Sequence, residues 1–180
     1  MSELAIPGMV PARTVAAAAA GDADALARIV DAHQLDMARL SLLVCGDPEM
    51  ARDAVQAAWV IAWKRMSSVK EPERLRAWLM SVAANEARQM ARRRRRFEVD
   101  HIDVASAGSS HGDPATRSGH VDLSIALRGL TTDDRTLLAL RYVAGFDASE
   151  IGRSMGMSAS GVRSRLSRLL ARLRTELTDD

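Results

Sequence analysis

The stretch DASEIGRSMGMSASGVRSRLSRLLAR, residues 147–172, decides the fold of the C-terminal part of this chain. Asp147 and Glu150 have the spacing of a capping box, which begins a short helix. Gly156 supplies a tight turn, and Ser158 can cap a second, longer helix that runs to about Glu176. The spacing predicts a helix-turn-helix, a motif that sets its second helix into the major groove of DNA.

The second helix of this motif divides into an apolar and a polar face. Its apolar stripe recurs at steps of three and four residues and consists of Val162, Leu166, Leu169 and Leu173. Arginines and small hydroxyl side chains occupy mainly the other side, where Arg gives reach to base edges and Ser permits close approach. Arg165, Arg172 and Arg174 suit phosphates or the fixing of the helix. A merely solvated basic face is the alternative. The predicted DNA-contacting residues are Ser160, Arg163, Ser164, Ser167, Arg168 and Arg172.

The sequence before this motif is also helical in pattern, back to a polar segment. Thr131 with Asp134 resembles a capping box, and the helix that follows carries apolar residues through Tyr142 before Gly145 ends it. Residues 97–121 lose periodicity and gain Gly, Ser, Asp and Pro, which indicates a flexible linker. The C-terminal domain is therefore expected at residues 122–176.

Residues 22–96 form a second helical block, preceded by residues 1–21, which we expect to be a disordered extension. A helix from about Asp24 to Cys45 is followed by Gly46-Asp47-Pro48, which can end one helix and cap the next. That next helix runs to about Met66, and a third begins near Leu75 and continues through the basic run. The tryptophans are predicted to be core residues. The fold class is thus all-α: two small helical domains joined by a flexible linker.

The positive charge of the chain comes almost entirely from arginine. All but Lys64 and Lys70 of its 25 basic residues are Arg, and the formal net charge is +2 with a pI of about 9.2. Arg88 and Arg92–Arg96 make a run without acidic residues, a pattern typical of a nucleic-acid or acidic-surface patch. A GC-rich genome is a second source of arginine, but two basic elements, one per domain, favour two contacts on one duplex.

Other classes of function find little support. Cys45 is a lone cysteine, expected to be a buried structural thiol, and no Cys/His cluster has zinc spacing. The histidines are scattered, and neither a phosphate-cradling glycine loop nor a nucleophile elbow appears. We therefore expect no enzyme, no catalytic residue, no metal and no cofactor. No apolar run has membrane-spanning length, so a cytoplasmic protein without membrane insertion is expected.

Three segments, in this order, resemble the extracytoplasmic-function group of sigma factors, within the sigma-70-type family. They are GDPEMARDAVQAAWVIAW from residue 46, RLRAWLMSVAANEARQMARRRRR from residue 74, and LTTDDRTLLALRYVAGFDASEIGRSMGMSASGVRSRLSRLLARLR from residue 130. The resemblance implies a protein that binds core RNA polymerase and directs transcription initiation at particular promoters. The first domain (region 2) is then expected to recognise and melt the minus-ten element. The C-terminal domain (region 4) is expected to read the minus-thirty-five element.

The resemblance also assigns residues of the first domain. Asp53, Gln56 and Val60 share one helix face and match the positions that dock on polymerase. The loop from Met66 to Pro72 matches a pocket for a base flipped out of the stack. Basic residues nearby would neutralise backbone phosphates. The residues expected at the minus-ten element are Ser67, Ser68, Val69, Lys70, Trp78, Asn85, Arg88, Arg92 and Arg93.

The chain departs from the family pattern at Ala57, Gln89, Gly161 and Ser167, which suggests a diverged subgroup. The resemblance implies promoter DNA, core polymerase and an anti-sigma factor as partners. The linker either lies in a polymerase channel or is a plain tether. The alternative function is a conventional helix-turn-helix regulator, which binds DNA without polymerase and uses residues 22–96 for sensing or dimerisation.

Overall fold

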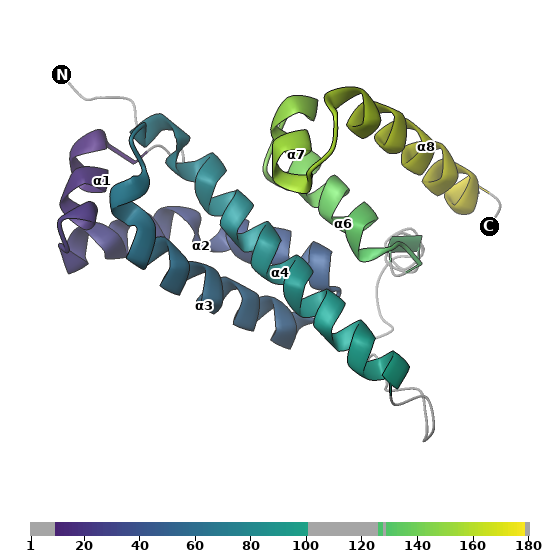
Figure 1. The fold of residues 1–180 in the computed structure, drawn as a ribbon, viewed down its shortest axis with the longest axis horizontal. Helices are drawn as coiled ribbons and strands as arrows, with labels where there is room; N and C mark the ends of the chain where they lie inside the picture. The colour runs from purple at the N-terminus through teal and green to yellow at the C-terminus, as the bar shows by residue number, and fades with distance from the viewer. Residues whose placement is uncertain (1–9, 101–125, 128, 179–180) are drawn as a thin grey trace.

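The computed structural model describes residues 10–100, 126–127 and 129–178. Every regular element within those ranges is a helix, and they form an N-terminal unit of α1–α4 and a C-terminal unit of α6–α8 (Figure 1). The predicted all-α, two-domain class is therefore confirmed. No helix in this described part is both long and apolar enough to cross a membrane.

The N-terminal unit is built on three long helices that pack on one another. They are α2 (Ala23–Cys45), α3 (Pro48–Arg65) and α4 (Leu75–Asp100), and the short 3-10 helices η1 (Met66–Ser68) and η2 (Pro72–Arg74) join the last two. Their shared interior is fully buried and consists of residues such as Ile29, Met37, Leu40, Ala58, Leu79 and Met80. This packing fixes the exposed faces of α3 and α4.

The turn between α2 and α3 follows the predicted capping chemistry. Gly46 ends α2 in the left-handed region with φ 71°. The side chain of Asp47 then accepts a hydrogen bond of 2.8 Å from the backbone N–H of Met50, and Pro48 takes the first helical position. These local signals were sufficient to place this helix boundary.

The prediction of disorder is wrong for part of residues 1–21. Residues Ala12–Ala19 form α1, whose Val15 and Ala18 are buried and which packs on α2 and η1. Alanine has the highest intrinsic helix propensity, so one apolar face is enough to hold so short a segment against a neighbouring helix. Residues 1–9 lie outside the described part.

Three further expectations about this unit had different outcomes. Helix α4 extends to Asp100, past the predicted start of the linker at residue 97, and residues 101–121 lie outside the described residues. Trp63 is 42% exposed and is not a core residue, while Trp59 and Trp78 are half-buried. Cys45 is buried as predicted. Its Sγ lies 3.6 Å from the carbonyl oxygen of Ala87, and burial raises the pKa of the thiol to about 11.

The C-terminal unit consists of α6 (Thr132–Leu138), the π-helical turn η3 (Ala139–Val143), α7 (Ala148–Met155) and α8 (Ala159–Thr178). Thr131 caps α6 by accepting a hydrogen bond of 3.1 Å from the backbone N–H of Asp134. The predicted helix through Tyr142 is present but widens into η3, which leaves Tyr142 61% exposed. Helices α2 and α4 of the first unit pack against α6 and η3 of the second.

Candidate nucleic-acid interface

The helix-turn-helix is held by the capping box that its sequence predicts. The Asp147 carboxylate accepts hydrogen bonds from the backbone N–H groups of Ser149 and Glu150, at 2.7 and 2.8 Å. In return, the Glu150 carboxylate accepts a hydrogen bond of 2.8 Å from the backbone N–H of Asp147. Hydrogen bonding by the N–H of Glu150 is the main cause that lowers the pKa of Asp147; desolvation opposes it, and the N–H of Ser149 lowers the pKa further. Gly156 turns the chain with φ 69°.

Close approach of backbone defines the angle between α7 and α8. A Cβ atom built on Gly152 would lie 2.5 Å from the carbonyl oxygen of Met157 in the turn. The neighbouring Ile151 and Val162, one from each helix, are fully buried. Only glycine fits at position 152 without a shift of the turn, so this residue sets how closely α8 is held against α7.

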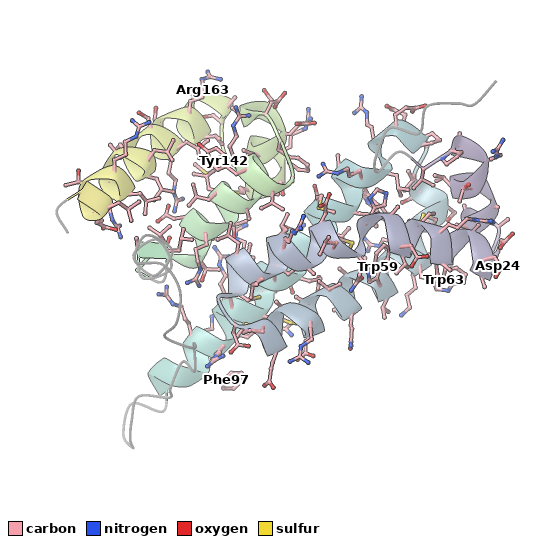
Figure 2. The ribbon with its side chains drawn as sticks, turned by 180° about the vertical axis from the view of Figure 1, so that it is seen from behind. Asp24, Trp59, Trp63, Phe97, Tyr142 and Arg163 are labelled. Atoms are coloured by element: carbon pink, nitrogen blue, oxygen red, sulfur yellow. The ribbon has the colours of Figure 1, made fainter. Side chains whose placement is uncertain are left out.

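The polar face of α8 is exposed to solvent. Arg163, labelled in Figure 2, projects outward from the helix. Arg165 instead points inward, where its Nε lies 2.8 Å from the Asp134 carboxylate of α6 and ties the two helices together. Arg172 is exposed but pairs with Glu176 at 2.7 Å. All six residues predicted to contact DNA from the helix-turn-helix are exposed on α8: Ser160, Arg163, Ser164, Ser167, Arg168 and Arg172.

A second polar stripe runs along α4. Trp78, Asn85 and Arg92 follow one another at seven-residue steps, which places them on one side of the helix. Asn85, Arg88 and Arg92 line an open groove between α3 and α4, together with Ile61 and Arg65 of α3. The structure thus gathers several predicted minus-ten residues at one surface.

The loop predicted to hold a flipped base lies at the other end of α4. Ser67, Ser68 and Lys70 are exposed, and Val69 is half-buried. The hydroxyl of Ser68 donates a hydrogen bond of 2.6 Å to the carbonyl oxygen of Arg65, the last residue of α3. Because α4 rises about 1.5 Å per residue, the loop and Arg88 are roughly 20 Å apart along the helix. A DNA strand of several nucleotides is needed to contact both.

Several arginines on α4 already form ion pairs with carboxylates of the same chain. Arg88 and Arg92 form ion pairs with Asp133 at the start of α6, and Arg94 pairs with Asp47 at 3.1 Å. Arg93 is exposed and has no ion pair within the described part of the chain. No local sequence pattern indicates these pairings, because the partners are distant in the chain.

A stripe on α3 carries the residues that the resemblance assigns to polymerase docking. Asp53 and Gln56 are exposed, and Val60 is 53% exposed. Trp63 continues the stripe after a further three residues, although the sequence pattern predicts it to be a core residue and does not assign it to this stripe. The same three- and four-residue periodicity that marks Asp53, Gln56 and Val60 could have identified it.

These features define a class of protein. The C-terminal unit carries a helix-turn-helix with an exposed Arg/Ser face. The N-terminal unit carries a basic stripe on α4 and a stripe of polar and apolar side chains on α3. This is the organisation of a DNA-binding transcription factor. The sequence matches the family model for sigma-70 region 2 over residues 29–97 and that for sigma-70 region 4 over residues 121–173. The chain therefore belongs to the sigma-70 family, in its extracytoplasmic-function group, whose members direct promoter-specific transcription.

Individual relatives agree with this assignment. The chain is 31% identical over 168 residues to a probable RNA polymerase sigma factor, RfaY of Xanthomonas campestris pv. campestris; the match covers 89% of this chain but 42% of that longer protein. It is 27% identical to the extracytoplasmic-function sigma factor SigL of Mycobacterium tuberculosis, over 92% of this chain and 96% of SigL. Among solved structures, the sigma factor RpoE of Bartonella quintana, crystallised with the anti-sigma factor NepR, has a TM-score of 0.65. Its sequence identity is 26%, covering 80% of this chain and 91% of that one.

Proposed function

We propose a division of labour between the two units of this sigma factor. Residues 22–96 bind core RNA polymerase through Asp53, Gln56 and Val60, and they recognise and melt the minus-ten element through the 67–70 loop and the α4 stripe. Residues 122–176 read the minus-thirty-five element through α8. Residues 97–121 connect the two, without a catalytic step, cofactor or metal at any point. The protein acts in the cytoplasm, where its polymerase and promoter are.

The observation that carries this proposal is the pair of exposed stripes on α3 and α4. A conventional regulator needs only the helix-turn-helix, whereas a docking stripe beside a basic groove supports a protein that joins DNA to a second macromolecule. Asp53, Gln56 and Val60 expose two polar side chains and one apolar side chain on one helix face. The groove with Asn85 and Arg88 lies between that same α3 and α4.

An anti-sigma factor is a further proposed partner. The Bartonella relative was crystallised with such a protein. The exposed apolar side chains of Val60 and Trp63 offer a surface that a protein partner can cover. Occupation of this α3 stripe would exclude polymerase from the chain.

Run-off transcription with core polymerase and a genomic promoter library tests the proposed function. We expect transcripts from a discrete set of promoters that are absent without the protein. Tight, sequence-specific binding of DNA by the protein alone, without initiation, would instead support the conventional regulator.

Replacing Arg168 by alanine is expected to weaken promoter choice. Arg168 is exposed on the outer face of α8, and its Nε makes only a 3.4 Å contact with the carbonyl oxygen of Ser164 on its own helix. If it reads a base, its loss costs about 1–3 kcal/mol at one base position and relaxes discrimination there. Competitive binding of holoenzyme to promoters with single-base changes in the minus-thirty-five element measures this. Arg153→Ala, an exposed arginine on α7, is the control, and equal losses across all sequences would make Arg168 a phosphate contact.

Neutralising two arginines of the basic run is expected to reduce the salt dependence of promoter binding. Arg93 and Arg95 are exposed near the end of α4. Each phosphate contact on a single strand contributes about 0.7 to the slope of log K against log salt. Arg93→Gln with Arg95→Gln should therefore lower the slope of holoenzyme binding by about 1.4. Arg28→Gln with Arg39→Gln removes the same charge from α2 and should leave the slope unchanged, and an unchanged slope in the first variant would remove the run from the DNA interface.

A further inference from the structure

The short helix α1 joins α2 through a tight corner. Gly21 takes the left-handed region with φ 98°, and the side chain of Asp22 then accepts a hydrogen bond of 2.9 Å from the backbone N–H of Ala25, in the first turn of α2. The backbone N–H of Asp22 also donates to the carbonyl oxygen of Ala17 at 3.0 Å. These contacts fix the direction in which α1 meets α2, so α1 has a defined place in the N-terminal unit.

The corner places α1 against the loop that joins α3 to α4. Figure 1 shows α1 beside this connection, and α1 packs on both 3-10 turns of it, η1 and η2, as well as on α2. Val15 and Ala18 of α1 and Met66 of η1 are all buried. They belong to one continuous core, against which the half-buried Val69 of the loop also packs. A helix far from the loop in the chain therefore forms part of the surface on which the loop rests.

The hydrogen bonds of the loop are local. The backbone N–H of Val69 donates to the carbonyl oxygen of Met66 at 3.1 Å. That of Arg74 donates to the carbonyl oxygen of Glu71 at 2.9 Å. Such bonds define the shape of each turn, but they do not attach the turns to the rest of the unit. Among the described residues, apolar packing on α1 and on the adjoining ends of α3 and α4 therefore sets where the loop stands.

A pocket for an extruded base depends on this placement. Selection among bases requires polar groups that are already held at hydrogen-bonding positions, because a site that must first become ordered loses binding free energy in doing so. Ser67, Ser68 and Lys70 present such groups and are exposed. The arginines of α4 stand on a separate long helix. Movement of the loop would therefore weaken selection of the base more than attraction for the phosphates.

We propose that α1 is a positioning element for promoter recognition: its buried Val15–Ala18 face braces the loop from Met66 to Pro72, so that the loop can discriminate the extruded base. The inference rests on the proposed function of that loop. Val15 and Ala18 are buried and act through the loop without touching DNA. Their effect is thus on the selectivity among bases and not on the general affinity for DNA.

Val15→Ala in the full chain tests the brace, with Val44→Ala as the matched control. Both changes remove the same two methyl groups from a buried valine, so they should cost comparable stability. Val44 lies about 30 Å along α2 from the end where α1 is attached. Hydrogen exchange of the free proteins, followed by mass spectrometry, should show residues 66–74 exchanging about tenfold faster in Val15→Ala and at the wild-type rate in Val44→Ala.

Selectivity for the base supplies the second readout. Holoenzyme is assembled with each variant and bound to promoters that carry each of the four bases in turn along the minus-ten element. At one position, Val15→Ala should reduce the preference for the best base by about fivefold, with unchanged selection at the minus-thirty-five element. Ala18→Leu overfills the same interface and should act in the same direction. Val44→Ala should keep the selectivity of the wild type.

Two results would overturn the inference. One is equal exchange of residues 66–74 in the two valine variants, and the other is wild-type base selectivity in a Val15→Ala protein whose loop exchanges faster. Failure of the proposed function gives a different result, because no form of the protein would then select a promoter with polymerase. The exchange of the free protein would still decide whether α1 holds the loop.

Discussion

Replacing Gly152 by valine is expected to destabilise the C-terminal unit by about 1–3 kcal/mol and to abolish recognition of the minus-thirty-five element. The first carbon of any side chain at this position meets the carbonyl oxygen of Met157 at 2.5 Å, and a branched one has no route around it. The turn must open, which changes how α8 sits on α7. Thermal unfolding followed by circular dichroism, together with holoenzyme binding to promoter DNA, measures both effects.

Ser154→Val is the control for this variant. It places the same β-branched side chain on the same helix α7, at a half-buried position. Its effect should be confined to a few tenths of a kcal/mol of helix propensity. Equal stability losses for the two variants would show that the close approach at Gly152 is not what holds the motif together.

Replacing Asp53 and Gln56 together by alanine is expected to weaken binding to core polymerase by more than tenfold. A few side chains dominate most protein interfaces, and losing such a pair costs about 2 kcal/mol or more. Both side chains are exposed, and alanine favours helix, so the fold should be unchanged. Titration of labelled protein with core polymerase measures the loss.

Glu49→Ala with Arg52→Ala is the matched control for the docking variant. These residues lie on the same helix, are exposed, and pair with each other at 3.9 Å. Polymerase affinity close to that of the wild type is expected. A fall in helicity of the Asp53/Gln56 variant would place those side chains in the core and remove the docking assignment.

The helix boundaries that sequence predicted well are those with local causes. Gly46, Asp47 and Pro48 act on the backbone within a few residues of themselves, and so does the capping box of Asp147 with Glu150. Such signals are complete within a short window and do not depend on what the chain packs against. The apolar stripe of α8 could be predicted equally well, because the buried residues of a helix recur with the helix period.

The features that sequence missed depend on contacts between distant residues. Helix α1 packs its apolar face on α2, and Trp63 is exposed because no helix in the described part of the chain covers it. The candidate site shows the same limit. The basic run identified Arg88 and Arg92 as candidate nucleic-acid contacts, but their partner Asp133 lies 45 and 41 residues away in the chain. No local pattern distinguishes an arginine held by a carboxylate from one open to DNA.

The buried thiol of Cys45 has a practical consequence for spectroscopy. With its pKa raised to about 11, only about one thiol in ten thousand is ionised at pH 7, and maleimide dyes react with the thiolate. The native cysteine is therefore silent toward such reagents while the protein is folded. A pair of cysteines introduced at exposed positions on α3 and α8 can be labelled selectively, and energy transfer between single dye pairs can then report the distance between the two units.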